Sequence, residues 1–262
     1  MMISKNKIKL IHALAQKKQR YSQHLFVAEG HKVVEDLLSR FECIYLAAKK
    51  DWLEEKQQLV SHLHHKGTEI QEVNDDELTR ASLLKTPQDV LAIFRIPEND
   101  EADQTLPERE LCLALDGIQD PGNMGTIVRI ADWFGITHIW CSQDTTDIYN
   151  PKTVQATMGA MARVQVHYTD LPAFLQSLSA DIPVYGTFLD GTDMYGQDLS
   201  SNGIIVMGNE GNGISRPVGN LVSKRLYIPS FPAERNTVES LNVAIATSII
   251  CAEFRRRQTA SK

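Results

Sequence analysis

The sequence predicts an α/β protein in which a parallel sheet, covered by helices on both faces, follows a smaller α/β domain. From Leu111 onward, strands that are apolar throughout alternate with helices, which is typical of parallel strands buried on both faces. An acidic stretch with two prolines, at 97–110, reads as a solvated linker. At 262 residues the chain is long enough for two cores. We therefore predict domains at 1–96 and 111–262.

In the first domain, short helices and strands alternate. Apolar residues at helical spacing predict the helices, and β-branched or aromatic runs predict the strands. In chain order we expect a helix near 7–18, a strand at 24–30 entering a helix at 30–39, a strand at 43–48, a helix near 51–65, a helix at 75–86 with an aspartate cap, and a strand at 90–96.

In the second domain, the alternation becomes regular. We expect a strand at 111–118, a helix at 123–134, a strand at 138–142, a helix near 151–160, a strand at 163–168, a helix at 170–178, strands at 183–189, 203–209 and 225–230 with a helical turn between the last two, and a closing helix at 240–254. The apolar run of that helix is about 12 residues, well below the roughly 20 needed to cross a bilayer, so we expect a core or interface helix. Ser240 and Asn242 at its start are typical capping residues.

Charge is distributed unevenly along the chain. The net charge of −6 argues against indiscriminate coating of nucleic acid. Residues 1–40, however, contain eight Lys or Arg and three Asp or Glu. This segment therefore has a net charge of +5, and the rest of the chain has a net charge of −11.

The remaining chemistry of the chain indicates a reduced, metal-free, cytoplasmic protein. The N-terminus has no apolar stretch followed by a cleavage site, and the four cysteines form no CxxC pair. The histidines of "SHLHHKG" have no Cys or carboxylate at ligand spacing, so we predict no metal at His62, His64 and His65.

Three segments that follow strand ends carry the candidate chemistry. The first, "LDGIQDPGNMGTIVRIADWFG", makes a turn at Asp120, after which Asn123 can cap a helix and Arg129 emerges one or two turns later. A helix N-terminus with a nearby guanidinium can hold a phosphate, although a capped core helix with one surface arginine would look the same.

The second segment, "VMGNEGNGIS", is rich in glycine but is neither a P-loop nor a dinucleotide fingerprint. Glu210 among these glycines suggests a carboxylate held near backbone amides or a ligand amine. The third segment, "YIPSFPAERNTVESLNVAIA", leads into the closing helix. Either segment alone is a weak indication.

Together and in this order, the segments resemble the three motifs of the SpoU branch of the SPOUT methyltransferases. These are Asn-x-Gly-x-x-x-Arg-x-Ala-x-x-Phe-Gly, then Gly-x-Glu-x-x-Gly, then Ile-Pro followed by Ser-Leu-Asn-Val, and the match covers 111–258. The stretches "FVAEGHKVVEDLL" and "KTPQDVLAIF" resemble the L30e/L7Ae-like substrate-binding domain of several ribosomal RNA methyltransferases. The connector between Pro229 and Ser240 is longer than is usual in the family.

The resemblance implies a SPOUT sheet ending in a C-terminal trefoil knot, although chains rarely thread loops. It also implies that S-adenosylmethionine donates a methyl group to a ribose 2′-hydroxyl of RNA, without a metal, in a homodimer. The donor would bind, largely through backbone groups, at Thr187, Gly208, Ile228 and Leu241. The catalytic residues would be Arg129, Asn123, Glu210, Ser240 and Asn242.

For Arg129, we favour clamping of phosphate and stabilisation of the developing alkoxide over a role as base, because a guanidinium stays protonated. The remaining residues would orient Arg129, the ribose and the knot loops. We expect residues 1–95 to dock RNA and 111–258 to hold donor and chemistry, so a 105–262 fragment should keep the donor and lose RNA.

Three alternatives stay open. Because of the N-terminal domain we prefer ribosomal RNA as the substrate, but tRNA is an alternative. A non-catalytic RNA-binding protein with the same fold is another. A doubly wound NAD enzyme would need a glycine fingerprint after its first strand, and "LDGIQDPGN" does not provide one.

Overall fold

The computed structural model describes residues 2–98, 103–232 and 240–260, and the chain divides into two compact units. Unit 1 contains Met1–Asp100 and Asp147–Ala162, and unit 2 contains Glu101–Thr146 and Arg163–Lys262. The chain therefore passes between the units three times. These units group residues by packing, whereas the domains predicted above group them by sequence, and that division stays a prediction.

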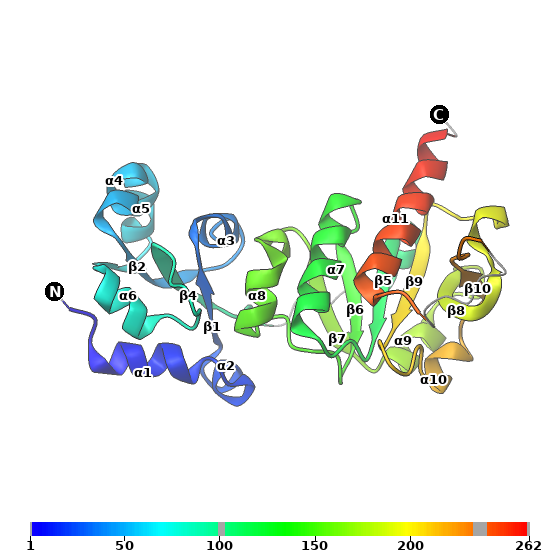
Figure 1. The fold of residues 1–262 in the computed structure, drawn as a ribbon, viewed down its shortest axis with the longest axis horizontal. Helices are drawn as coiled ribbons and strands as arrows, with labels where there is room; N and C mark the ends of the chain where they lie inside the picture. The colour runs from blue at the N-terminus through cyan, green and yellow to red at the C-terminus, as the bar shows by residue number, and fades with distance from the viewer. Residues whose placement is uncertain (1, 99–102, 233–239, 261–262) are drawn as a thin grey trace. The chain divides into compact units, whose positions relative to one another are not determined.

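Unit 1 is built on a four-stranded sheet with the order β1-β4-β2-β3, in which only β2 and β3 run parallel. Its strands are β1 (Leu25–Glu29), β2 (Cys43–Ala48), β3 (Glu69–Glu72) and β4 (Val90–Arg95). Its helices are α1 (Lys5–Ala13), α2 (Lys17–Gln23), α3 (His31–Leu37), α4 (Lys50–Glu55), α5 (Gln57–His65), α6 (Asp75–Ala81) and α8 (Pro151–Thr157), followed by the short 3₁₀ helix η2 (Ala160–Ala162) (Figure 1).

Some elements of unit 1 differ from the sequence-based expectations. The single helix expected near 7–18 is two helices, because the backbone leaves the helical conformation at Gln16. In a continuous helix the carbonyls of Leu14 and Ala15 would accept from backbone N–H groups four residues later. Here they accept hydrogen bonds from the guanidinium of Arg20, both at 2.9 Å. Helix α6 is capped by Asn74 rather than by an aspartate. Strand β3 was not expected, since its sequence, EIQE, is polar.

Residues 147–162 are anchored in unit 1 by a buried ion pair and by aromatic packing. The guanidinium of Arg20, which is 1% exposed, donates to Asp147 Oδ2 at 2.5 and 3.0 Å. The ring centroids of Tyr149 and Phe26 lie 4.9 Å apart, and Phe41 packs edge-on against both rings. This segment is therefore part of the core of unit 1.

Unit 2 contains a six-stranded sheet with the order β10-β8-β9-β5-β6-β7, and every paired neighbour runs parallel. The strands are β5 (Leu111–Asp116), β6 (His138–Ser142), β7 (Gln165–Thr169), β8 (Val184–Asp193), β9 (Gly203–Gly208) and β10 (Lys224–Tyr227). The helices are α7 (Pro121–Trp133), α9 (Leu171–Ser177), α10 (Arg216–Gly219) and α11 (Val243–Ala260), with 3₁₀ turns η1 (Leu106–Glu108) and η3 (Met194–Gly196).

Helices cover both faces of this sheet, so the predicted α/β class is confirmed (Figure 1). Helices α7 and α11 pack together on one face, and α9 and α10 lie on the other, over a core that includes Trp140 and Phe174. The trefoil knot stays a prediction, and 233–239 lie outside the described residues. Within the described part of the chain, no helix is both long and apolar enough to cross a membrane.

Candidate active site

A cavity of about 770 Å³ opens at the carboxyl ends of β8, β9 and β10 in unit 2. In open parallel sheets this edge is where ligands bind. The wall is formed by the end of β9 and its glycine-rich turn, the segment after Gly186 in β8, the residues after β10, and the start of α11. Its members include Phe188, Leu189, Tyr195, Met207, Leu226, Tyr227, Val243 and Ile249.

The four residues predicted for the donor all lie on this wall, although they come from four separate segments of the chain. They are Thr187, Gly208, Ile228 and Leu241. At Gly208 a side chain would not fit, because a Cβ there would lie 2.3 Å from the backbone of Gly213 and Ile214. The close approach of these two backbone segments therefore depends on glycine.

The turn after β9 is held by Asn209. Its Oδ1 accepts hydrogen bonds from the backbone N–H groups of Gly211 and Asn212, at 2.9 and 3.0 Å. Its Nδ2 donates to the carbonyl of Gly117, at 2.7 Å, just after β5. The turn that carries Glu210 is thus fixed both within itself and to the neighbouring strand end.

A chain of side-chain hydrogen bonds joins all three motifs. The amide of Asn242 donates to Asn123 Oδ1 at 3.0 Å, and the amide of Asn123 donates to Glu210 Oε1 at 2.7 Å. Glu210 also lies on the cavity wall, as does Ser240. Residues from the first, second and third segments therefore meet at one place in unit 2.

The helix caps differ in part from the sequence-based expectation. Asn242 caps α11 as expected, since its Oδ1 accepts from the N–H groups of Ala244 and Ile245 at 3.0 and 3.3 Å. The expectation that Asn123 caps α7 was wrong, because Asp120 accepts from the Asn123 N–H at 2.8 Å and is the capping residue. As a result, the Asn123 side chain is available to join Asn242 to Glu210.

Arg129 stands apart from this chain. It lies on α7 with an exposed side chain, and within the described residues it makes no hydrogen bond or ion pair. A free guanidinium on the same helix as Asn123 can contact an anionic substrate without first breaking an internal bond.

Arg225 of β10 holds part of the cavity wall. Strand β8 pairs with β10 at Gly186 and again at Thr192, and the register shifts between the two pairings. In the intervening segment, Phe188 lies under the Arg225 guanidinium, 3.4 Å from Cζ to ring centroid, and Asp190 pairs with it at 2.6 Å. Arg225 therefore holds the 187–191 segment, whose first three residues line the cavity.

Tyr195, another residue of the cavity wall, is tied to α11. The guanidinium of Arg257 donates to the Tyr195 carbonyl at 2.5 Å and to Glu253 at 2.8 Å. Hydrogen bonds from Arg256 and Arg257 lower the pKa of Glu253 from 4.5 to about 2. The carboxylate is thus kept ionised between two guanidinium groups.

Sequence reasoning did not identify Phe188, Tyr195, Asn209 or Arg225. "YGTFLDG" drew attention to Thr187, but nothing in the sequence shows that β8 leaves its ladder after Gly186. For Asn209, the one usable indication was its place as the polar residue at the end of the strand expected at 203–209.

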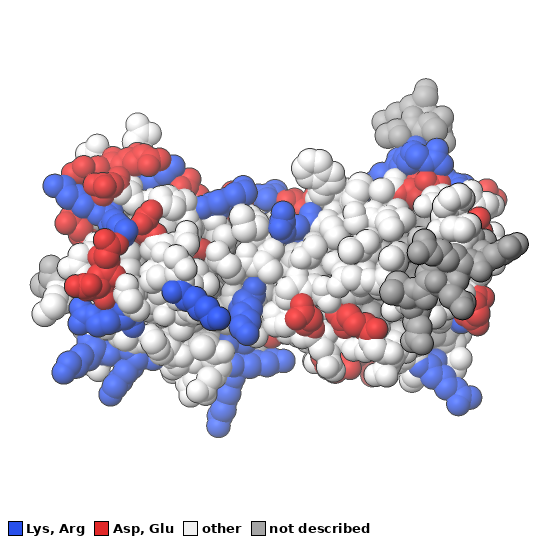
Figure 2. All heavy atoms as spheres, in the orientation of Figure 1, with Lys and Arg blue, Asp and Glu red and all other residues white. Residues whose placement is uncertain are grey.

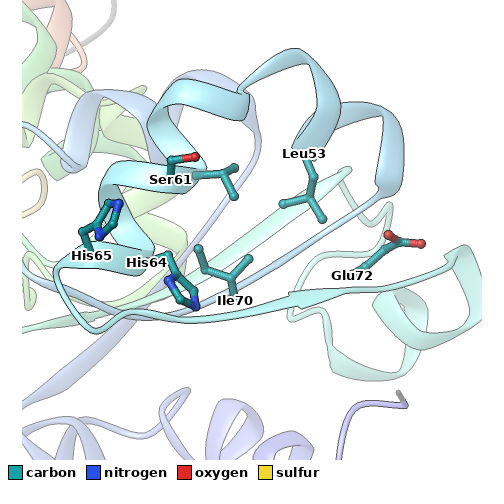
Figure 3. A pocket seen from close by; sticks show the side chains of 7 residues that line it. Leu53, Ser61, His64, His65, Ile70 and Glu72 are labelled. Atoms are coloured by element: carbon teal, nitrogen blue, oxygen red, sulfur yellow. The ribbon is translucent and has the colours of Figure 1, made fainter.

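Within the described residues, neither the cysteines nor the histidines of α5 form a second reactive centre. The four cysteines are buried, and burial raises the pKa of the Cys43, Cys112 and Cys251 thiols to about 12. His64 and His65 line a separate depression of about 430 Å³ between α5 and β3, beside Ile70 and Glu72 (Figure 3). Among the described residues, no group of three or more His, Cys, Asp or Glu is placed to hold a metal.

Comparison with known proteins identifies the family of the chain. Residues 110–252, more than half of the chain, match the model of the SpoU rRNA methylase family. The chain belongs to the SpoU rRNA methylase family. Residues 5–92 match an MRM3-like substrate binding domain. Both parts of the resemblance found in the sequence are thereby confirmed.

Individual relatives extend over nearly the whole chain. The 23S rRNA (guanosine(2553)-2′-O)-methyltransferase RlmP of Bacillus subtilis is 29% identical and covers 95% of this chain and 96% of its own. A solved structure from Porphyromonas gingivalis, assigned to the TrmH family of RNA methyltransferases, is 40% identical and has a TM-score of 0.85. The match covers 98% of this chain and 100% of that one. The structure of an AdoMet-bound rRNA methyltransferase from Sinorhizobium meliloti is 30% identical, with a TM-score of 0.83, and the match covers 98% of this chain and 97% of that one.

Proposed function

We propose that this protein transfers a methyl group from S-adenosylmethionine to a ribose 2′-hydroxyl of ribosomal RNA. The observation that carries the proposal is the hydrogen-bonded chain from Asn242 through Asn123 to Glu210 at the edge of the cavity. It brings the three SpoU motifs to one place beside a space large enough for a cofactor. RlmP, a relative over nearly the full length, is named for 2′-O-methylation of 23S rRNA.

The cavity fits S-adenosylmethionine in size and lining. Its volume of about 770 Å³ lies within the range usual for small-molecule sites, roughly 300–1,000 Å³. Apolar residues such as Leu226, Ile228 and Leu241 suit an adenine ring, and backbone groups of the glycine-rich turn suit its polar edges. Glu210 supplies a carboxylate on the wall that can face the cationic sulfonium.

In the proposed reaction, S-adenosylmethionine supplies a methyl group on a sulfonium, which is already a good leaving group. The protein places the ribose oxygen in line with that methyl group and stabilises the charge that develops on the oxygen. Arg129 stays protonated, so it binds the substrate phosphate and the developing alkoxide and does not accept the hydroxyl proton. As the new bond from oxygen to methyl forms, the bond from methyl to sulfur breaks, S-adenosylhomocysteine leaves and the hydroxyl proton passes to solvent water. Asn123 and Asn242, fixed to each other and to Glu210, orient the loops around it.

The test is methyl transfer in vitro. Purified protein is incubated with methyl-labelled S-adenosylmethionine and in vitro transcribed 23S rRNA, and the digested RNA is searched for 2′-O-methylated nucleosides by mass spectrometry. We expect one labelled position in 23S rRNA. Label in a tRNA transcript instead would favour the tRNA alternative. Donor binding without methylation of either RNA would favour a non-catalytic RNA-binding protein.

We also propose that the active form is a homodimer built on α7 and α11. These packed helices carry large apolar side chains at the surface, with Trp133 85% exposed and Ile245 54% exposed, and Leu241 just before α11 is 46% exposed. Burial of such side chains against a second copy is favourable. Sedimentation should therefore give twice the chain mass of 29.4 kDa, and a fully active monomer would contradict the proposal.

We place the reaction in the cytoplasm. There ribosomal RNA is accessible, and the buried cysteines of the described chain are reduced thiols, as that compartment requires.

A further inference from the structure

The N-terminal helices of unit 1 carry a concentrated positive charge. No acidic residue occurs before Glu29, whereas α1 and α2 contain Lys5, Lys7, Lys9, Lys17, Lys18 and Arg20. Two of these six form ion pairs, and Lys17 lies over the ring of Tyr21, 5.8 Å from Nζ to centroid. Arg20 is buried against Asp147, and Lys7 pairs with Glu69 at 2.7 Å and lies over the ring of Tyr45.

The other four lysines face solvent and make no ion pair with any described residue. We call them the basic ridge: Lys5, Lys9, Lys17 and Lys18. Lys5 and Lys9 are one helical turn apart and therefore share a face of α1. Lys17 and Lys18 begin α2, three residues after α1 gives way to a turn.

Local stability does not explain this arrangement. Both helices carry lysines and no acid in their first turn, although the N-terminal end of a helix favours negative charge. Like charges at i and i+4, such as Lys5 and Lys9, also repel each other. Side chains that weaken the elements carrying them are expected where an external partner neutralises them.

Neither α1 nor α2 contains an acidic residue, although Glu69 of β3 approaches Lys7. Figure 2 shows Lys and Arg along the α1 and α2 side of unit 1 and Asp and Glu gathered over α4 and α5. The exposed acids of α4 are Asp51, Glu54 and Glu55. A polyanion is therefore attracted to the side of unit 1 that carries α1 and α2.

We propose that the basic ridge binds the phosphate backbone of the RNA substrate. The inference rests on the proposed function, because that function makes RNA the polyanion. It goes further by assigning docking to four side chains of α1 and α2, with Arg20 excluded because its charge is already neutralised. Lysine contacts to phosphate position a nucleic acid without reading its sequence.

The experiment compares two variants of the full-length protein with equal loss of charge. In the ridge variant Lys5, Lys9, Lys17 and Lys18 become Gln. In the control variant four exposed lysines elsewhere in unit 1 become Gln, namely Lys32, Lys50, Lys66 and Lys85. Filter binding of a labelled 23S rRNA transcript is measured over a series of salt concentrations, and donor binding is measured by calorimetry.

The ridge variant should bind the transcript at least about tenfold more weakly, and the slope of log affinity against log salt should become less steep by about 3, since each phosphate contact contributes roughly 0.7–0.9. The control variant should keep a slope near that of the wild type, and both should bind S-adenosylmethionine as the wild type does.

Equal losses in both variants, or an unchanged slope in the ridge variant, would overturn the inference. So would a wild-type protein that shows no salt-sensitive binding of the transcript. The proposed function fails separately, if wild-type protein that binds the transcript transfers no methyl group to it.

Discussion

Arg225 provides a direct test of where the methyl donor binds. Replacing it with alanine removes the guanidinium from the face of Phe188 and breaks the pair with Asp190. A cation over an aromatic ring at an exposed site contributes about 0.5–1 kcal/mol, and a surface ion pair about 0.2–1 kcal/mol. The 187–191 segment should therefore lose about 1–2 kcal/mol of local stabilisation.

If this segment must be in place for the donor to bind, the affinity falls by the same free energy, which corresponds to about 5- to 30-fold. Calorimetric titration of S-adenosylmethionine into Arg225→Ala measures the loss. Arg225→Lys keeps the charge but not the planar group, so its affinity should be intermediate. Arg216→Ala, which removes an exposed arginine from α10 outside the cavity lining, is the matched control.

A folded Arg225→Ala protein with wild-type donor affinity would refute this reasoning. It would mean either that Arg225 does not hold the segment or that the donor binds outside the 770 Å³ cavity. Phe188→Ala separates the two explanations, because it changes the cavity wall directly. If that variant also binds the donor normally, the cavity assignment is wrong.

Three further predictions concern the chain of motif residues and the α11 helix. Asn242→Ala should destabilise the protein by about 1 kcal/mol through loss of the α11 cap and should weaken donor binding, and a double-mutant cycle with Asn123→Ala in thermal unfolding should show coupling of roughly 0.5–1.5 kcal/mol. Arg129→Ala should leave donor affinity intact but slow single-turnover methylation by about 10²-fold, and loss of donor binding would invert the assigned roles. Because the pKa of Glu253 is lowered to about 2, its ionised carboxylate stabilises the folded protein fully above pH 4.5, and this contribution is lost as the pH falls toward 2. The free energy of unfolding of Glu253→Gln, measured in denaturant, should therefore depend less on pH across that window than that of the wild type does.

The fold of unit 2 was predictable because two of its central strands, β5 and β9, are apolar along almost their whole length. β5 and β9 are buried at nearly every residue, so their sequences have no polar face that could suggest a different element. β3 escaped prediction for the opposite reason, since it has only exposed or half-buried residues and is kept in the sheet by pairing with β2. Backbone pairing of this kind leaves no trace in hydrophobic periodicity.

The candidate site was predictable only where its geometry depends on residue type. Gly208 has to be glycine because another backbone passes within contact distance, and Asn242 caps a helix, so both leave a recognisable pattern. The contact between Arg225 and Phe188 joins residues far apart in the sequence across a register shift. Its existence depends on how β8 and β10 pair, which no local pattern specifies.

The packing of residues 147–162 changes how the division of labour should be tested. A 105–262 fragment, expected from sequence to keep the donor site, would lack Arg20 and Phe26, the buried partners of Asp147 and Tyr149. An unpaired buried carboxylate and an exposed aromatic ring both destabilise the folded state.

We therefore predict that, in the isolated fragment, backbone amides of 147–162 exchange with deuterium much faster than in the full-length protein. Amides of β5 and β9 serve as the internal control and should stay protected in both, because their pairing lies within unit 2. Equal protection of 147–162 in fragment and full-length protein would contradict the assignment of this segment to unit 1. If residues 147–162 unfold in the fragment as predicted, weak RNA binding by the fragment does not show that residues 1–95 bind RNA. The unfolded segment is joined to unit 2 at Thr146 and Arg163, so its unfolding also disturbs unit 2. Full-length variants with altered surface lysines avoid this ambiguity.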